Sequence, residues 1–154
     1  MLLHLLEQTQ KFPASMEEVW AFFSDPRNLP RITPPAMRLR ITSPLPPAMY
    51  AGMLVSYRVR PLPAMTVDWV TQITHVEPSV RFVDEQRIGP YRFFQHQHAF
   101  REIEGGVEMH DLVQYALPRG GGMARRFLVA PALRDMFIYR NQTLAELLGA
   151  WTGG

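Results

Sequence analysis

The chain has 154 residues, of which 47% are hydrophobic, so it is long and apolar enough to form one domain over residues 1–154 with its own core. This composition argues against an intrinsically disordered chain. The formal net charge is only +2, and the arginines are scattered apart from the pair Arg125–Arg126. Without a basic run to follow phosphates, the sequence does not favour nucleic-acid binding.

Cysteine is absent, which excludes disulfides, thiolate metal sites and a cysteine nucleophile. Residues 1–8 lack the basic and long apolar regions of a signal peptide. No stretch approaches the ~20 apolar residues that a membrane-spanning helix needs. We therefore expect a cytoplasmic protein without an integral membrane segment.

The first elements expected along the chain are a strand and a short helix. Residues 2–12 alternate loosely, which is typical of a strand. Ser15 and Glu18 then have the spacing of a capping box, in which each side chain bonds the other residue's backbone amide. An apolar run follows directly, so we predict a helix over residues 16–23.

A second short helix is expected to begin at Asp25 and Pro26, because Asp suits the N-cap and Pro suits the first helical position. Pro34–Pro35 should end it. The chain then becomes rich in strand-forming residues, and Pro61 and Pro63 are expected to close one of the strands. The strands predicted in this part cover residues 37–42, 52–60 and 65–76.

Three further strands are predicted between Val80 and Tyr115, where aromatic, β-branched and polar residues alternate. Two turn signals, Ile88-Gly89-Pro90 and Glu104-Gly105-Gly106, divide this stretch into two consecutive hairpins. It also holds the densest group of ionisable and aromatic side chains in the chain.

The last segment has the three- and four-residue spacing of an amphipathic helix, from Leu133 to Trp151. Pro131 cannot lie inside a helix without the loss of a hydrogen bond. We expect it either to kink the helix or to begin it after a separate turn at residues 124–129. Gly149 should end the helix.

This order predicts an α+β protein. One long helix covers only one face of a sheet of six or seven antiparallel strands, so the sheet is expected to bend around the C-terminal helix. Two short helices follow the first strand. The nine Met and nine Phe residues suit a core that leaves a cavity between sheet and helix, although a packed core without a ligand has the same composition.

The order resembles the helix-grip fold of the START-like (SRPBCC) superfamily. The opening PASMEEVWAFFSDPRNLPRITPP and the closing RDMFIYRNQTLAELL are similar to its first helices and its final helix. The segments DEQRIGPYRFFQHQHAF and MHDLVQYALP more narrowly resemble a bacterial subfamily described as cyclase/dehydrase-like or ligand-binding. The resemblance implies the fold and a cavity, but not one reaction, because functions in the superfamily range from lipid carriage to catalysis.

The turn at Glu104–Gly106 also predicts which residues face each other across the last hairpin. Residues on one face repeat every two positions, and the apolar members indicate that this face points inward. The expected opposed pairs on it are Phe100 with Met109, His98 with Asp111, His96 with Val113 and Phe94 with Tyr115.

A buried carboxylate beside a histidine orients the imidazole and raises its pKa, which suits proton transfer. We therefore identify His98, His96 and Asp111 as candidate catalytic residues for a polyketide cyclase or dehydratase. The alternative is that His98 and Asp111 only satisfy each other in a structural network. The two histidines with Asp84 or Glu85 could also ligate a metal, but no third histidine is placed nearby, so we expect no metal and no cofactor.

Three functions thus remain open. The first is binding of a small hydrophobic or aromatic molecule, lipid- or polyketide-like, in the cavity. The second is the cyclase or dehydratase, and the third is an interaction module, monomeric or dimeric through Leu2, Leu3, Leu5 and Leu6. The residues expected to contact a ligand are Tyr57, Trp69, Phe82, Asp84, Gln86, Phe94, Phe100, Met109, Tyr115, Met136, Phe137 and Arg140.

Overall fold

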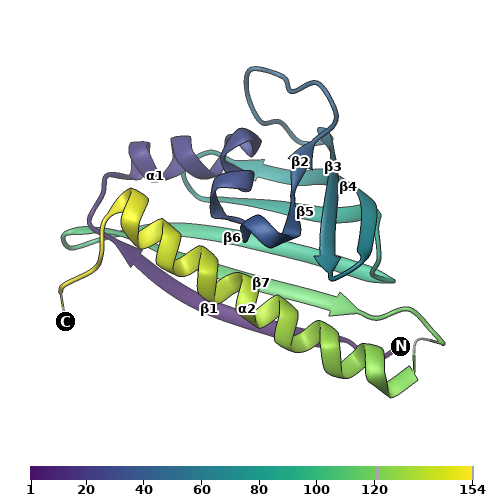
Figure 1. Cartoon of the computed structure of the whole chain (residues 1–154). Coiled ribbons are helices and arrows are strands. Elements are labelled where there is room, and N and C mark those ends of the chain that lie inside the picture. The colour runs from purple at the N-terminus through teal and green to yellow at the C-terminus, as the bar shows by residue number, and fades with distance from the viewer. Residues whose placement is uncertain (121, 154) are drawn as a thin grey trace.

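A computed structural model describes residues 1–120 and 122–153 of the chain. Seven antiparallel strands form one sheet in the order β1-β7-β6-β5-β4-β3-β2. The long helix α2 runs along β1 and β7, and the short helices lie beside it on the same side of the sheet (Figure 1). This is the expected α+β helix-grip arrangement. Its elements are β1 (His4–Phe12), α1 (Met16–Phe23), the 3-10 helices η1 (Pro26–Ile32) and η2 (Pro35–Met37), β2 (Arg40–Ile41), β3 (Leu54–Leu62), β4 (Met65–Glu77), β5 (Arg81–Ile88), β6 (Phe93–Ile103), β7 (Gly106–Ala116) and α2 (Gly122–Leu148).

The opening of the chain folds as its capping residues predict. The Ser15 hydroxyl accepts from the amide of Glu18, while the Glu18 carboxylate accepts from the amide of Ser15, so the capping box is complete. The Asp25 carboxylate accepts from the amide of Arg27 and caps η1. Proline at the start of η1 and again within it limits the backbone amides available for α-helical bonds, which accounts for a 3-10 helix here.

The last hairpin has the register expected from its turn. Phe100 lies opposite Met109, and His98 lies opposite Asp111. Burial alternates along both strands, with these side chains on the buried face. His110, one position away, is partly exposed and bonds Glu7 instead. The predicted parity of the central sheet is therefore confirmed.

Two strand predictions were wrong in their extent. The strand expected over residues 37–42 contains only Arg40–Ile41, because η2 and a left-handed residue at Arg38 occupy its first positions. Pro61 was expected to end the next strand, but β3 continues through it to Leu62. The β3–β4 register shifts between Val59 and Leu62, and such irregularities accommodate proline.

Helix α2 continues through Pro131, so neither a separate turn at residues 124–129 nor a helix start at Pro131 is observed. Gly121 lies outside the described residues, and so do the side chains of residues 122–126. Gly149 follows the last residue of α2 and has a positive φ of 99°. Glycine adopts such a φ readily, and it often ends helices in this way.

The core has three clusters of buried side chains. One joins α1, η1 and the ends of β1, β6 and β7 around Phe12 and Phe100. A second packs α2 onto β6 and β7 around Phe137 and Tyr115, and a third lies between β3 and β4 around Val55. The clusters meet at shared side chains, since Leu29 and Met49 pack against both the first and the third, and Trp69 against the second and the third.

Candidate functional site

A cavity of about 170 Å³ lies on the inner face of the sheet, enclosed by η1 and α2. Its floor comes from β3 to β7, including Tyr57, Trp69 and Phe82, and Met136 closes it from α2. A second cavity of about 80 Å³ adjoins it, and both are lined by Met37, Trp69, Phe94 and Met136. Two aromatic side chains and two flexible methionines thus line both spaces.

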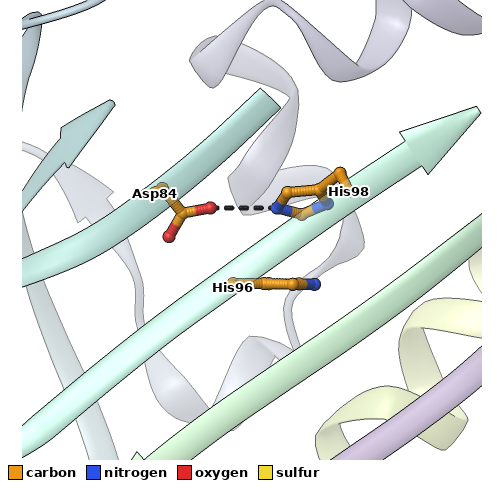
Figure 2. Close-up of side chains that lie close together, drawn as sticks. All are labelled: Asp84, His96 and His98. Atoms are coloured by element: carbon orange, nitrogen blue, oxygen red, sulfur yellow. Dashed lines mark hydrogen bonds and ion pairs between the residues drawn. The ribbon is translucent and has the colours of Figure 1, made fainter. Parts of the chain in front are cut away.

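Four ionisable side chains form a connected cluster on the wall of this cavity: Asp84 from β5, His96 and His98 from β6, and Asp111 from β7. Nε2 of His98 lies 2.9 Å from Oδ2 of Asp84, and Nε2 of His96 lies 2.8 Å from Oδ1 of Asp111. Figure 2 shows Asp84 reaching toward His98, with the ring of His96 below that of His98.

His98 connects the two carboxylates. Its Nδ1 atom lies 3.2 Å from Oδ1 of Asp111, close enough for an ion pair but without the alignment of a hydrogen bond. The second oxygen of Asp111 accepts from Nε2 of Gln8 at 3.1 Å. Gln8 in turn exchanges two hydrogen bonds with Asn141 of α2. Gln8 of β1 therefore links the polar cluster to Asn141 of α2.

The two histidines have opposite pKa shifts. Burial and the neighbouring His98 lower the pKa of His96. Burial also acts to lower the pKa of His98, but the interactions with Asp111 and Asp84 outweigh it and raise that pKa. Burial opposes the charge on Asp111, yet its two histidine partners hold its pKa well below the usual range. Near neutral pH this environment favours a neutral His96 beside a protonated His98.

Arg140 of α2 brings a positive charge to the same cavity. Its residue is 8% exposed, and burial lowers its pKa. The phenol of Tyr57 also lines the cavity, where burial raises its pKa, so its hydroxyl stays neutral and can donate a hydrogen bond. The site thus combines an apolar wall with hydrogen-bond donors and two histidines that pair with carboxylates.

The structure brings most of the sequence-predicted site residues to the larger cavity. These are the three candidate catalytic residues and seven of the predicted ligand contacts: Tyr57, Trp69, Phe82, Asp84, Phe94, Met136 and Arg140. Five others lie elsewhere. Gln86 binds both backbone groups of Tyr91, and the remaining four pack in the core clusters, namely Phe100, Met109, Tyr115 and Phe137.

Sequence reasoning did not identify the residues of η1 and the following loops as cavity residues. Leu29, Ile32 and Met49 cover the cavity from the side opposite the sheet. They lie outside the predicted strands and the final helix, and only the path of the folded chain brings them over the sheet. The signal that was available is the interrupted helix after Asp25, which places an irregular segment between the strands and α2.

Asp84, His96 and His98 present ligand-type atoms within 4.8 Å of one another, which is compatible with a metal ion. The rings of His96 and His98 lie with centroids 3.6 Å apart and 30° between their planes. One nitrogen of each ring already pairs with a carboxylate oxygen, His96 with Asp111 and His98 with Asp84. As they stand, these side chains form a hydrogen-bonded cluster.

Comparison with known proteins identified one family. The model of the family described as "Polyketide cyclase / dehydrase and lipid transport" matches residues 12–137. The comparison with curated proteins found no match. Among solved structures, a protein from Rhodobacter sphaeroides has 21% identity and a TM-score of 0.68, over 96% of this chain and 97% of that one.

Two other solved structures have the same fold. Protein Ms6760 from Mycobacterium smegmatis is 18% identical with a TM-score of 0.67, over 94% of this chain and 90% of its own. Ara h 8.0201 is 11% identical with a TM-score of 0.64, over 94% and 99% respectively. At these identities the likeness extends to the fold alone. None of the described helices is long and apolar enough to cross a membrane.

Proposed function

Because the chain belongs to the polyketide cyclase/dehydrase and lipid transport family, as its sequence predicted, we propose that its single domain binds a small hydrophobic or aromatic molecule between sheet and α2. The observation that carries this proposal is the cavity of about 170 Å³ lined by Trp69, Phe82 and Phe94. An apolar cavity of about 150 Å³ in another protein accepts benzene. This size favours a molecule of one or two rings over a long acyl chain.

Native mass spectrometry of the purified protein, with a denatured control, tests whether a molecule is already bound. We expect extra mass that disappears on unfolding. Where the protein carries none, titration with naphthalene is expected to shift the NMR signals of the Trp69 indole and of Phe94. No bound mass and no shift at these residues would contradict the proposal.

A matched pair of variants localises the binding to the cavity. Met136→Trp places a larger side chain between the two cavities and is expected to abolish the naphthalene shifts. Ile138→Trp adds the same ring at a position of the same helix that is 50% exposed, and should leave binding unchanged. Equal binding by both variants would place the ligand outside this cavity.

A second candidate function is proton transfer to and from a bound ketone, as in a cyclase or dehydratase. It is supported by two buried histidines on one cavity wall whose pKa values are shifted in opposite directions. A neutral His96 that donates from Nε2 to Asp111 leaves Nδ1 as a base. A protonated His98, whose ring nitrogens face Asp84 and Asp111, is the acid of the cluster.

The test uses 2-tetralone, a two-ring ketone with exchangeable protons next to its carbonyl. We expect the protein to accelerate deuterium exchange at that carbon beyond the rate with an equal concentration of free imidazole. His96→Gln should remove the acceleration, because it removes the base while keeping a polar side chain. An unaccelerated exchange with the wild-type protein would leave ligand binding as the function.

A further inference from the structure

The side chain of Arg140 has few partners for a buried guanidinium. Its residue is 8% exposed, and it lines the larger cavity. Nε donates to the carbonyl oxygen of Ile32 at 3.4 Å, and one terminal nitrogen lies 4.0 Å from Sδ of Met136. Both contacts are at the long end for hydrogen bonds. A guanidinium has five N–H donors, so most of its capacity remains unused among the described residues.

The nearby carboxylates do not supply the missing partner. Asp111 accepts from His96 through one oxygen and from Gln8 through the other, and Asp84 pairs with His98. No carboxylate of the described residues lies within 4.0 Å of the Arg140 guanidinium. His98 stands between the two aspartates and offsets one of their two charges at close range. The attraction between Arg140 and these aspartates acts at longer range and supplies no hydrogen bond to the guanidinium.

A buried charge without hydrogen-bonded compensation is costly, and proteins keep one mainly where a partner arrives. The Arg140 guanidinium also lies over the Phe137 ring, with Cζ 5.2 Å from the ring centroid. This contact stabilises the cation weakly and leaves the edge of the planar guanidinium free for hydrogen bonding.

We propose that Arg140 binds a carboxylate group of the ligand, so that the molecule held in the cavity is an aromatic or short-chain hydrophobic acid. This inference rests on the proposed binding function and names its ligand class. The guanidinium fork matches the two oxygens of a carboxylate, whereas a neutral carbonyl offers one acceptor atom without charge. The apolar part of the acid would lie against Trp69, Phe94 and Met136, where the two cavities meet.

The experiment compares two probes of the same size, naphthalene-2-carboxylate and naphthalene-2-carboxamide, by isothermal titration calorimetry. We expect the wild-type protein to bind the carboxylate about tenfold to a hundredfold more tightly than the amide, the range of a charge-assisted hydrogen bond. Arg140→Met should reduce this preference to within about twofold while retaining binding of the amide.

The matched control is Arg134→Met, which removes the same charge from an exposed position of the same helix. It should keep the full preference, because Arg134 does not line the larger cavity. Arg140→Lys provides a second variant that keeps the buried charge without the fork. We expect it to bind the carboxylate about threefold to tenfold more weakly than wild type, with amide binding unchanged.

Three results would overturn the inference. These are equal binding of both probes by the wild-type protein, a preference that survives in Arg140→Met, and, should that variant fail to fold, undiminished carboxylate binding by Arg140→Lys. In each case amide binding would persist, so hydrophobic binding itself would stand. If neither probe binds and naphthalene also fails to bind, the proposed function falls together with the inference.

Discussion

The imidazole rings of His96 and His98 lie 3.6 Å apart from centroid to centroid, and both are buried. A proton on one ring therefore raises the free-energy cost of a proton on the other, so the two titrate as a coupled pair. Only His98 contacts both Asp84 and Asp111, which decides which ring takes the first proton.

We expect NMR titration of the ring signals to show His98 protonating above the ordinary pKa of 6.5 and His96 remaining neutral until well below it. Asp84→Asn should lower the pKa of His98, because it removes the carboxylate at 2.9 Å from Nε2. Protonation of His96 before His98 would contradict the assignment of acid and base.

The same shifts predict how stability changes with pH. Below 6.5 the unfolded chain binds a proton at His96 that the folded protein does not, so the free energy of unfolding falls as pH falls. Above 6.5 the folded protein keeps a proton on His98 that the unfolded chain has lost, so stability also falls as pH rises toward the folded pKa.

Urea unfolding over a pH series should therefore show greatest stability near pH 6.5. A further loss of stability is expected in acid. Because folding lowers the pKa of Asp111, the unfolded chain takes up a proton at this residue before the folded protein does. The variant His98→Gln should lose the decline on the alkaline side only. A stability that keeps rising from pH 6.5 to 8 in the wild-type protein would show that His98 is neutral when folded.

Asp111→Asn is expected to destabilise the protein by about 3 kcal/mol, because it leaves a buried protonated His98 without one of its carboxylates. Asp111 is 2% exposed and accepts from His96 and Gln8. The control Asp68→Asn changes a side chain that is 74% exposed and paired with Arg58, and should cost less than about 1 kcal/mol. Equal costs in urea unfolding would mean that the buried cluster contributes no specific stability.

Much of the site could be predicted because one tight turn determines a register. The turn at Glu104–Gly106 correctly placed His98 opposite Asp111 and put both on the inner face. Local sequence does not determine side-chain rotamers, however. The carboxylate of Asp111 forms its hydrogen bond with His96, its diagonal neighbour, rather than with His98 directly opposite. His98 forms its hydrogen bond instead with Asp84 of β5, although Asp84 lies opposite His96 in the register.

The less predictable parts depend on irregular backbone. Register shifts in β4 between Val70 and Thr71 and between Ile73 and His75 leave no pattern in a single sequence, yet they change which residues of the long strand face the cavity. The path of η1 over the sheet is likewise set by tertiary packing. The sequence therefore did not indicate that residues such as Ile32 line the cavity.

Gly106 is expected to tolerate no side chain. A Cβ atom at this position would overlap the backbone carbonyl oxygen of Phe12 at the end of β1, and neither backbone can move independently in the paired sheet. Gly106→Ala should therefore cost about 3 kcal/mol. Gly52→Ala is the control, because its Cβ meets no atom and only its positive φ is strained, at about 1 kcal/mol. Thermal unfolding that ranks the two variants in the opposite order would contradict this account.

The pairing of β1 with β7 has a consequence for how the molecule folds. His4 pairs with Tyr115 and Phe12 with Val107, so β1 can form its ladder only after β7, far along the sequence, has been synthesised. Contacts between such distant residues slow folding, since the loop between them must close first. During that time Leu3 and Leu5 stand beside an unpaired strand edge, so the nascent chain is most open to mispairing with another copy before β7 has emerged.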